Sequence, residues 1–170
     1  MSQAANSSGM MLDWNSCVHP TLHFSPDTPL TVLYDKLRER GESEGYAAVV
    51  DIGRPVGIIS RAQICQLLGS KYGHCLFGKK TAGDCMNEKF LCISNRMSAQ
   101  EVLSSALSRP NPLFYYDVVL INDAGLYCGL ISLRELVQIQ SALLSSLAEA
   151  QERKQNMPRG FLDPPQQRSA

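Results

Sequence analysis

The chain has 170 residues, of which 44% are hydrophobic and 19% charged, which is enough to bury one sizeable core or two small cores that share an interface. Its 16 basic and 16 acidic side chains cancel, so net charge favours neither nucleic acid nor a membrane surface as a partner. No apolar run approaches the roughly 18 to 20 residues that span a bilayer, and no secretory signal pattern opens the chain. We therefore expect a cytoplasmic protein.

The cysteines and histidines give no clear metal or disulfide pattern. Six cysteines are present without a C-x-x-C pair, which favours free thiols in a reducing compartment. Cys17, His19 and His23 form the one grouping with metal-like spacing, but Pro20 disfavours the helix that would align the histidines. Because a structural zinc needs four ligands, we expect no metal site.

The first half of the chain contains signals for a small α and β unit. Residues 1–15 are expected to be disordered. Thr28 followed by Pro29 predicts the N-cap and first turn of a helix, and apolar residues then recur with helical spacing. In chain order, the patterns that follow predict strands at 46–51 and 56–59, a turn at 52–54, and a second helix from Ser60.

The stretch from Gly73 to Thr81, GHCLFGKKT, nearly matches a phosphate-binding loop. Such a loop needs a Ser or Thr hydroxyl directly after its lysine, and a strand running into it. Lys80 occupies the hydroxyl position, and a helical pattern precedes the loop. We therefore interpret the stretch as an inter-repeat loop in which Gly73 ends the helix with a left-handed C-cap.

The second half repeats the pattern of the first. Ser98 and Glu101 predict a capping box at the start of a helix, and predicted strands at 118–121 and 126–131 lead into a helix from Ser132. The stretches around Asp51 and Asp123 align at an offset of 72, and the preceding helices at an offset near 69 or 70. Two half-size copies that share a core are therefore expected.

The C-terminal run continues the last helix well beyond the repeat. Leu136, Leu143 and Ala150 recur every seven residues, with Leu147 between the last two. This spacing predicts either a self-associating or signal-transmitting helix, or an amphipathic helix packed on its own domain. Residues 156–170 are rich in proline and polar residues, and we expect them to be disordered.

The repeated unit resembles a pair of CBS domains, the regulatory modules named after cystathionine β-synthase. The resemblance rests on Val49–Ser60 and Val119–Ser132, and Ser70–Met86 is similar to the joint between CBS domains in bacterial signalling proteins. It implies an α+β fold of two β-α-β-β-α repeats packed face to face about a pseudo-two-fold axis. The expected organisation is a disordered segment at 1–15, repeat 1 at 16–73, a linker at 74–84, repeat 2 at 85–140, a helical extension at 141–155 and a disordered tail at 156–170.

The resemblance also implies a function. CBS pairs act as non-catalytic regulatory modules that sense an adenine nucleotide or related nucleoside between the repeats and signal to a partner or output domain. The implied ligands are AMP, ADP, ATP or S-adenosylmethionine, with no required cofactor. The implied assembly is a homodimer through the helices at 30–37 and 102–107 together with the C-terminal heptads. The alternative is a ligand-free CBS pair that serves as a dimerisation or scaffolding element. No catalytic motif supports an enzyme.

The ligand-binding residues follow by resemblance. In the family a hydroxyl and an Asp three residues later grip the ribose; here the hydroxyls are Ser60 and Ser132, and the Asp positions hold Gln63 and Glu135. Capping boxes at the same residues are the alternative. Because Glu135 retains a carboxylate, we expect its cleft to be the better equipped one. The remaining candidates are arginines at helix starts, strand residues beside the base, and tyrosines that either stack on a base or lie half-buried in the sheet: Arg61, Arg134, Val118, Ile131, Tyr115 and Tyr116.

Overall fold

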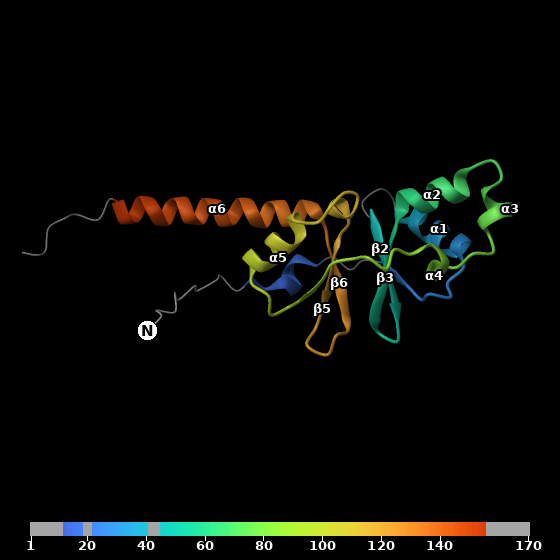
Figure 1. Ribbon diagram of the computed structural model, residues 1–170, viewed down its shortest axis with the longest axis horizontal. Helices are drawn as coiled ribbons and strands as arrows, with labels where there is room; N and C mark the ends of the chain where they lie inside the picture. The colour runs from blue at the N-terminus through green and yellow to red at the C-terminus, as the bar shows by residue number, and fades with distance from the viewer. Residues whose placement is uncertain (1–11, 19–21, 41–44, 156–170) are drawn as a thin grey trace, which may run out of the picture.

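The computed structural model describes residues 12–18, 22–40 and 45–155, which form two small sheets flanked by helices (Figure 1). The first sheet contains β1 (His23–Phe24), β2 (Tyr46–Asp51) and β3 (Arg54–Ser60), and the second contains β4 (Cys92–Ser94), β5 (Val118–Ile121) and β6 (Tyr127–Ile131). The helices are, in chain order, η1 (Trp14–Cys17), α1 (Leu30–Glu39), α2 (Arg61–Gly69), α3 (Gly73–Phe77), α4 (Ala82–Cys85), α5 (Ala99–Leu107), η3 (Leu113–Tyr115) and α6 (Leu133–Gln155).

Both repeats have the same strand topology. β1 pairs parallel with β2, which pairs antiparallel with β3, and β4, β5 and β6 repeat this arrangement. A parallel pair needs a crossover connection, and α1 and α5 supply it. The predicted α+β fold with two β-α-β-β-α repeats is confirmed.

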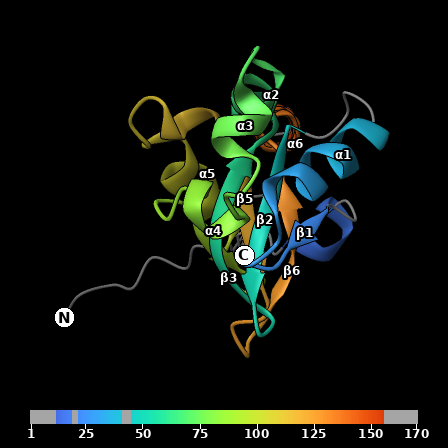
Figure 2. The same cartoon turned by 90° about the vertical axis from the view of Figure 1, so that its right-hand side faces the viewer.

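The two sheets pack face to face between two outer layers of helices (Figure 1). Ala48 and Ile58 from the first sheet meet Val119 and Leu130 from the second, and all four are at most 1% exposed. Side chains alternate between the faces of a strand, so the neighbouring residues point outward to the helices. Figure 2 shows α1 to α4 gathered over the outer face of the first sheet. Each repeat therefore depends on the other to cover the inner face of its sheet.

Segments that precede each repeat pack on the opposite repeat. Trp14 in η1 is 1% exposed within the core of the second repeat, where its Nε1 donates to the Met97 carbonyl at 2.7 Å. Ala82 and Phe77, which precede the second repeat, pack instead on the core of the first. The expectation of disorder through residue 15 is therefore wrong for Trp14, because a buried indole with a satisfied N–H holds this segment. The expected disorder at 1–11 and 156–170 lies outside the described residues.

The hairpin turns of the two repeats differ. Asp51 pairs with Arg54 across a two-residue turn in which Ile52 and Gly53 have φ of 46° and 79°. The β5–β6 turn is longer, and the Asn122 side chain accepts from backbone N–H groups within it. As a result Val49 corresponds to Leu120, an offset of 71, while Gly57 corresponds to Gly129, an offset of 72. The expected match of Asp51 with Asp123 is wrong by one residue, because the length difference falls inside the turn.

The helix starts agree in part with the sequence patterns. The capping box at Ser98 and Glu101 is confirmed, since the Glu101 carboxylate accepts from the Ser98 N–H at 2.8 Å and the Ser98 hydroxyl accepts from the Glu101 N–H. At the first helix, however, the N-cap position is Pro29 rather than Thr28. The Thr28 carbonyl instead accepts from the Ala82 N–H at 2.8 Å, so a contact with α4 fixes this residue.

The loop that resembles a phosphate-binding loop is largely helical. α2 ends at Gly69, and Gly73 begins α3 rather than ending the preceding helix. The expected left-handed C-cap at Gly73 is therefore wrong. Gly73 is buried, and a Cβ there would lie 2.2 Å from the Leu67 carbonyl oxygen, so this glycine is required by the close packing of α3 on α2.

α6 is one continuous helix through residue 155. Leu136 is fully buried in the second core and Leu143 packs against that core, so these two residues of the expected heptad anchor the helix to its own repeat. The apolar residues of α1 and α5 that were expected to form a dimer surface are also core residues: Leu30, Leu33, Leu37 and Val102 are at most 1% exposed. Within the described ranges, no helix combines the length and apolar character needed to cross a bilayer.

Candidate functional site

An open pocket of about 530 Å³ lies where the two repeats meet. The start of α2 forms one wall, and residues 85–89, from the end of α4 toward β4, form a second. Tyr116, two residues before β5, forms a third. Both repeats therefore contribute side chains. The lining residues are Gln63, Cys85, Met86, Asn87, Glu88, Lys89 and Tyr116.

The backbone of the second wall is fixed by pairing with β3. Ile58 and Asn87 exchange two backbone hydrogen bonds, at 3.0 and 2.8 Å. Gly57 allows this approach, because a Cβ there would lie 2.5 Å from Met86 Sδ. The Asn87 side chain then accepts from the Lys89 N–H at 2.8 Å, which forms a turn and leaves Glu88 and Lys89 exposed at the pocket rim.

The side chains of the pocket offer stacking, hydrogen-bonding and cationic groups. The Tyr116 ring packs against Tyr46 with ring centroids 5.1 Å apart, so one face of an aromatic ring is held in place beside the pocket. The Gln63 amide donates to the Cys85 carbonyl at 3.5 Å, a long hydrogen bond that a ligand can replace. Burial raises the pKa of the Cys85 thiol, which is therefore neutral near pH 7. Lys89 is the one lining group with a positive charge.

Three of the predicted ligand residues lie at the start of α2. Ser60 occupies the N-cap position with extended backbone, but its side chain makes no capping hydrogen bond there. The alternative of a capping box at Ser60 and Gln63 is therefore wrong, and Gln63 lines the pocket. Arg61 is half-buried, and its N–H donates to the Gly45 carbonyl at 2.9 Å.

The capping box of the second repeat does form. The Glu135 carboxylate accepts from the Ser132 N–H at 2.7 Å and from the Ser132 hydroxyl at 3.0 Å, and the Glu135 N–H donates to that hydroxyl at 3.3 Å. These contacts satisfy donors at the start of α6 without any ligand. Arg134, the next candidate, is exposed.

Two further predicted residues are turned away from the space between the repeats. Val118 and Ile131 pair across β5 and β6, and both are 0% exposed in the core formed with α5 and α6. The inner face of this sheet carries Val119 and Leu130 instead. Because side chains alternate along a strand, Val118 and Ile131 have no surface for a ligand in this arrangement.

The surface next to Glu135 is related to the pocket by the internal symmetry. Gln63 corresponds to Glu135, because both lie three residues after the serine that precedes the last helix of a repeat. The first-repeat counterpart of the wall at 85–89 includes residues 19 and 20, which lie outside the described residues. Residue 19 is His19, a member of the grouping with metal-like spacing. In the part of the chain that the structure describes, no three His, Cys, Asp or Glu side chains gather as metal ligands.

A half-buried ionisable cluster beside the two sites was not anticipated from the sequence. Burial raises the pKa of Asp117 to about 7, the Glu135 charge adds to the rise, and Arg109 opposes it. Arg109 donates to the Ala106 and Phe114 carbonyls at 2.9 and 3.2 Å, while its buried Nη1 atom has no hydrogen-bond partner. Burial, followed by the Asp117 charge, also raises the pKa of Tyr46. A carboxylate that directly precedes a buried strand, as in YYDVV, is the signal that marks this cluster.

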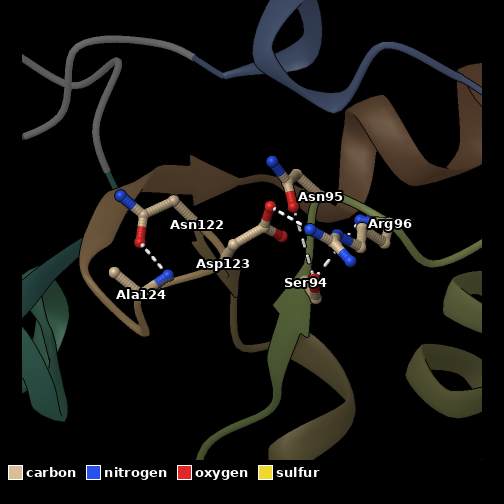
Figure 3. Close-up of polar contacts among 6 residues, drawn as sticks. All are labelled: Ser94, Asn95, Arg96, Asn122, Asp123 and Ala124. Carbon is tan, nitrogen blue, oxygen red and sulfur yellow. Dashed lines mark hydrogen bonds and ion pairs between the residues drawn. The ribbon is translucent and has the colours of Figure 1, made fainter.

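The remaining polar cluster lies at the opposite end of the second sheet and has a structural role (Figure 3). Arg96, which follows β4, forms an exposed ion pair with Asp123 in the β5–β6 turn. The side-chain carbonyl of Asn122 accepts a hydrogen bond from the Ala124 N–H at 3.0 Å. An exposed ion pair contributes about 0 to 1 kcal/mol, so this cluster steadies the turn.

Comparison with known proteins agrees with this architecture. The CBS domain family model matches residues 17–70, and the second repeat has the same topology. A CBS domain-containing protein of unknown function from Bacillus anthracis superposes with a TM-score of 0.63 at 15% identity, over 79% of this chain and 95% of that one. The chain folds as a CBS-domain pair.

Two structures similar to this CBS pair contain a nucleotide. CBSX2 from Arabidopsis thaliana, in complex with AMP, has a TM-score of 0.58 at 15% identity, over 78% of this chain and 96% of that one. The cytosolic domain of the Mg²⁺ channel MgtE, in complex with ATP, has a TM-score of 0.54 at 15% identity, over 70% of this chain and 44% of that one. A search of curated proteins by sequence found no match to this CBS pair.

Proposed function

We propose that the chain is a non-catalytic regulatory module that binds an adenine nucleotide, or a related nucleoside ligand, between its two CBS repeats and signals to a partner or output domain. The observation that carries this proposal is the pocket of about 530 Å³ with walls from both repeats. Its volume lies within the range of small-molecule sites, roughly 300 to 1,000 Å³. A ligand that touches both walls couples its binding to the relative position of the repeats.

The lining residues match the parts of a nucleotide. Tyr116 offers an aromatic face for the base, and the Gln63 amide offers a donor and an acceptor for ribose hydroxyls. Lys89 at the rim offers a cation for phosphate. The AMP-bound and ATP-bound structures of the same fold support this class of ligand. The site beside Ser132, Glu135 and Arg134 is a second proposed position, for which the Glu135 carboxylate would have to leave its capping box.

Calorimetric titration of the purified chain with AMP, ADP, ATP, S-adenosylmethionine and adenosine tests the proposal. We expect Lys89→Ala to weaken binding of the phosphorylated ligands by about tenfold or more, because a charged hydrogen bond contributes roughly 1.5 to 3 kcal/mol, and to leave adenosine binding unchanged. Lys79→Ala, at an exposed lysine outside the pocket, is the matched control. If none of these ligands binds, the proposed function is wrong.

Tyr116 provides a second test with a neighbouring control. Tyr116→Ala should weaken binding of every adenine ligand, whereas Tyr115→Ala, at an exposed tyrosine that does not line the pocket, should not. Equal affinity in the two variants would contradict the assignment of the base position. Thermal melts of both variants separate loss of stacking from loss of fold.

The alternative function is a ligand-free CBS pair that serves as a dimerisation or scaffolding element. The capping box at Ser132 and Glu135 favours it, because the one carboxylate retained at a ribose position already accepts two hydrogen bonds within the chain. This alternative predicts no heat of binding with any nucleotide and an unchanged melting temperature in their presence.

A further inference from the structure

A basic surface with two exposed apolar side chains lies on α3 and its flanks, at the end of the molecule opposite α6 (Figure 1). Tyr72 and Leu76 are 62% and 68% exposed. The Leu76 N–H donates to the Tyr72 carbonyl at 3.0 Å, so the two residues lie one helical turn apart, on one side of that turn. Exposed cations surround them. The residues of this surface, which we call the α3 surface, are Arg38, Lys71, Tyr72, Leu76, Lys79 and Lys80.

Aromatic rings position two of the lysines. Lys71 Nζ lies 5.6 Å from the centroid of the Tyr72 ring, and Lys80 Nζ lies 5.7 Å from the centroid of the Phe77 ring. A contact of this kind orients an ammonium group without neutralising its charge. The lysines therefore remain able to attract an anion.

An aromatic contact also joins α1 to this surface. The Arg38 guanidinium lies 5.7 Å from the centroid of the Tyr34 ring, and Tyr34 packs edge-on against His74 of α3 at 6.3 Å. Glu39, the neighbouring carboxylate on α1, forms its ion pair with Lys36 at 3.3 Å. Arg38 therefore adds its positive charge to that of the lysines.

The chain places no carboxylate of its own to balance these cations. No acidic residue occurs between Asp51 and Asp84. The Asp84 carboxylate accepts from the Thr81 N–H at 2.9 Å and from the Thr81 hydroxyl at 3.3 Å. Among the residues that the structure describes, no ion pair involves a lysine of the α3 surface. In a chain with 16 basic and 16 acidic side chains, this is a local concentration of positive charge.

The second repeat has no counterpart of α3. In the first repeat α2 ends at Gly69 and the chain turns into α3, whereas in the second repeat α6 continues unbroken to Gln155. The internal duplication therefore does not account for the α3 surface. Large apolar side chains that stay exposed within a polar rim mark interaction sites.

The form of the α3 surface favours an acidic protein segment over a membrane or a nucleic acid. Helices that bind a bilayer surface present a long apolar face, and α3 has five residues. Single-stranded nucleic acid binds by stacking its bases on aromatic faces, but cations of this chain already lie over the rings of Tyr34, Tyr72 and Phe77. Carboxylates on either side of an apolar side chain complement cations on either side of an apolar pair.

We propose that the α3 surface docks an acidic segment of a partner protein, with its carboxylates on the lysines and Arg38 and an apolar side chain against Tyr72 and Leu76. That this segment belongs to the signalling partner rests on the proposed function. The docking itself needs no nucleotide, because none of these residues lines the pocket. Failure of docking and failure of nucleotide binding are therefore separate results.

Nuclear magnetic resonance titration of the isotope-labelled full chain tests the docking with two synthetic peptides. In the first peptide a leucine is flanked on both sides by glutamates, and in the second the glutamates are replaced by glutamines. We expect the first peptide to shift the backbone amide signals of residues 71–80 and the second to leave them unchanged. The shifts should weaken as salt is added, because salt screens exposed charges.

Charge-reversal variants test which cations take part. Lys79→Glu and Lys80→Glu should each raise the dissociation constant of the acidic peptide by about fivefold or more, because a repulsion replaces an exposed ion pair. Leu76→Ser should also weaken binding. Arg153→Glu is the matched control, since it changes the net charge equally at an exposed position near the far end of α6, and it should leave the affinity unchanged. Circular dichroism melts establish that all four variants are folded.

Three results would overturn the proposal. The first is an acidic peptide that leaves the signals of residues 71–80 unmoved. The second is equal weakening by Arg153→Glu and Lys80→Glu, because binding would then depend on net charge alone. The third is tighter binding at the same residues by a single-stranded oligonucleotide or by phosphatidylserine vesicles, which would assign the surface to another class of partner.

Discussion

Replacing Asp117 by asparagine should stabilise the chain at about pH 8 and remove a pH dependence below that value. Burial raises the pKa of Asp117 from 3.8 to about 7, with Glu135 adding to the rise and Arg109 opposing it. Each pKa unit corresponds to about 1.36 kcal/mol. Ionising this carboxyl therefore costs the folded state up to about 4 kcal/mol, which asparagine of nearly the same shape avoids.

The sign of the effect follows from proton binding. Below about pH 4 the Asp117 carboxyl is protonated in both the folded and the unfolded chain. Between about pH 4 and pH 7 the folded chain keeps a proton that the unfolded chain has released, so the free energy of unfolding falls as the pH rises. Above about pH 7 the Asp117 carboxyl is ionised in both the folded and the unfolded chain, so it no longer makes the free energy of unfolding depend on pH. The advantage of Asp117→Asn should therefore grow across this window and then level off.

Urea unfolding at a series of pH values measures the difference, with the fluorescence of Trp14, the single tryptophan and 1% exposed, as the signal. Asp35→Asn, at an exposed carboxylate on α1, is the control, and its effect should stay within about 0.5 kcal/mol at every pH. A gain for Asp117→Asn that is the same at pH 5 and pH 8 would refute the reasoning, as would the absence of any gain at pH 8.

Three further predictions concern local stability. Ile52→Asn should raise the free energy of unfolding by about 1 kcal/mol in thermal melts, because a β-branched residue at φ of 46° is strained and asparagine is favoured in such turns; a gain of the same size for Ile52→Val would contradict this. Glu135→Ala should lower the free energy of unfolding by about 0.5 to 2 kcal/mol in urea, through loss of the capping box, whereas Gln63→Ala should change it little. Equal losses in the two variants would count against the capping role of Glu135. Trp14→Ala should cost about 3 to 5 kcal/mol by circular dichroism, and a near-neutral result would mean that η1 does not hold the second core.

The fold was predictable because its signals are local and occur twice. Alternating apolar residues and glycine-containing turns marked both hairpins, and the capping box at Ser98 and Glu101 marked the start of α5. The contact of Trp14 with Met97 spans 83 residues, and no local pattern encodes it. The one-residue error in aligning Asp51 with Asp123 arose because the length difference lies in the turn, where both copies have similar residues.

The candidate site was less predictable, because one sequence pattern has two outcomes in this chain. Ser60 and Gln63 have the same spacing as Ser132 and Glu135, yet only the second pair forms a capping box. The Gln63 amide turns instead toward the Cys85 carbonyl, which the sequence places far away. The pocket wall at 85–89 likewise depends on pairing with β3, a tertiary contact that periodicity does not reveal.

A crystal structure of the chain with saturating AMP tests the central claim most directly. Our account predicts nucleotide density between the two repeats, with the base against Tyr116, the ribose near Gln63 and the phosphate within hydrogen-bonding distance of Lys89. Density confined to the surface beside Glu135 would contradict this choice of pocket. A structure at saturating AMP with no nucleotide bound between the repeats would contradict the proposed sensing function itself.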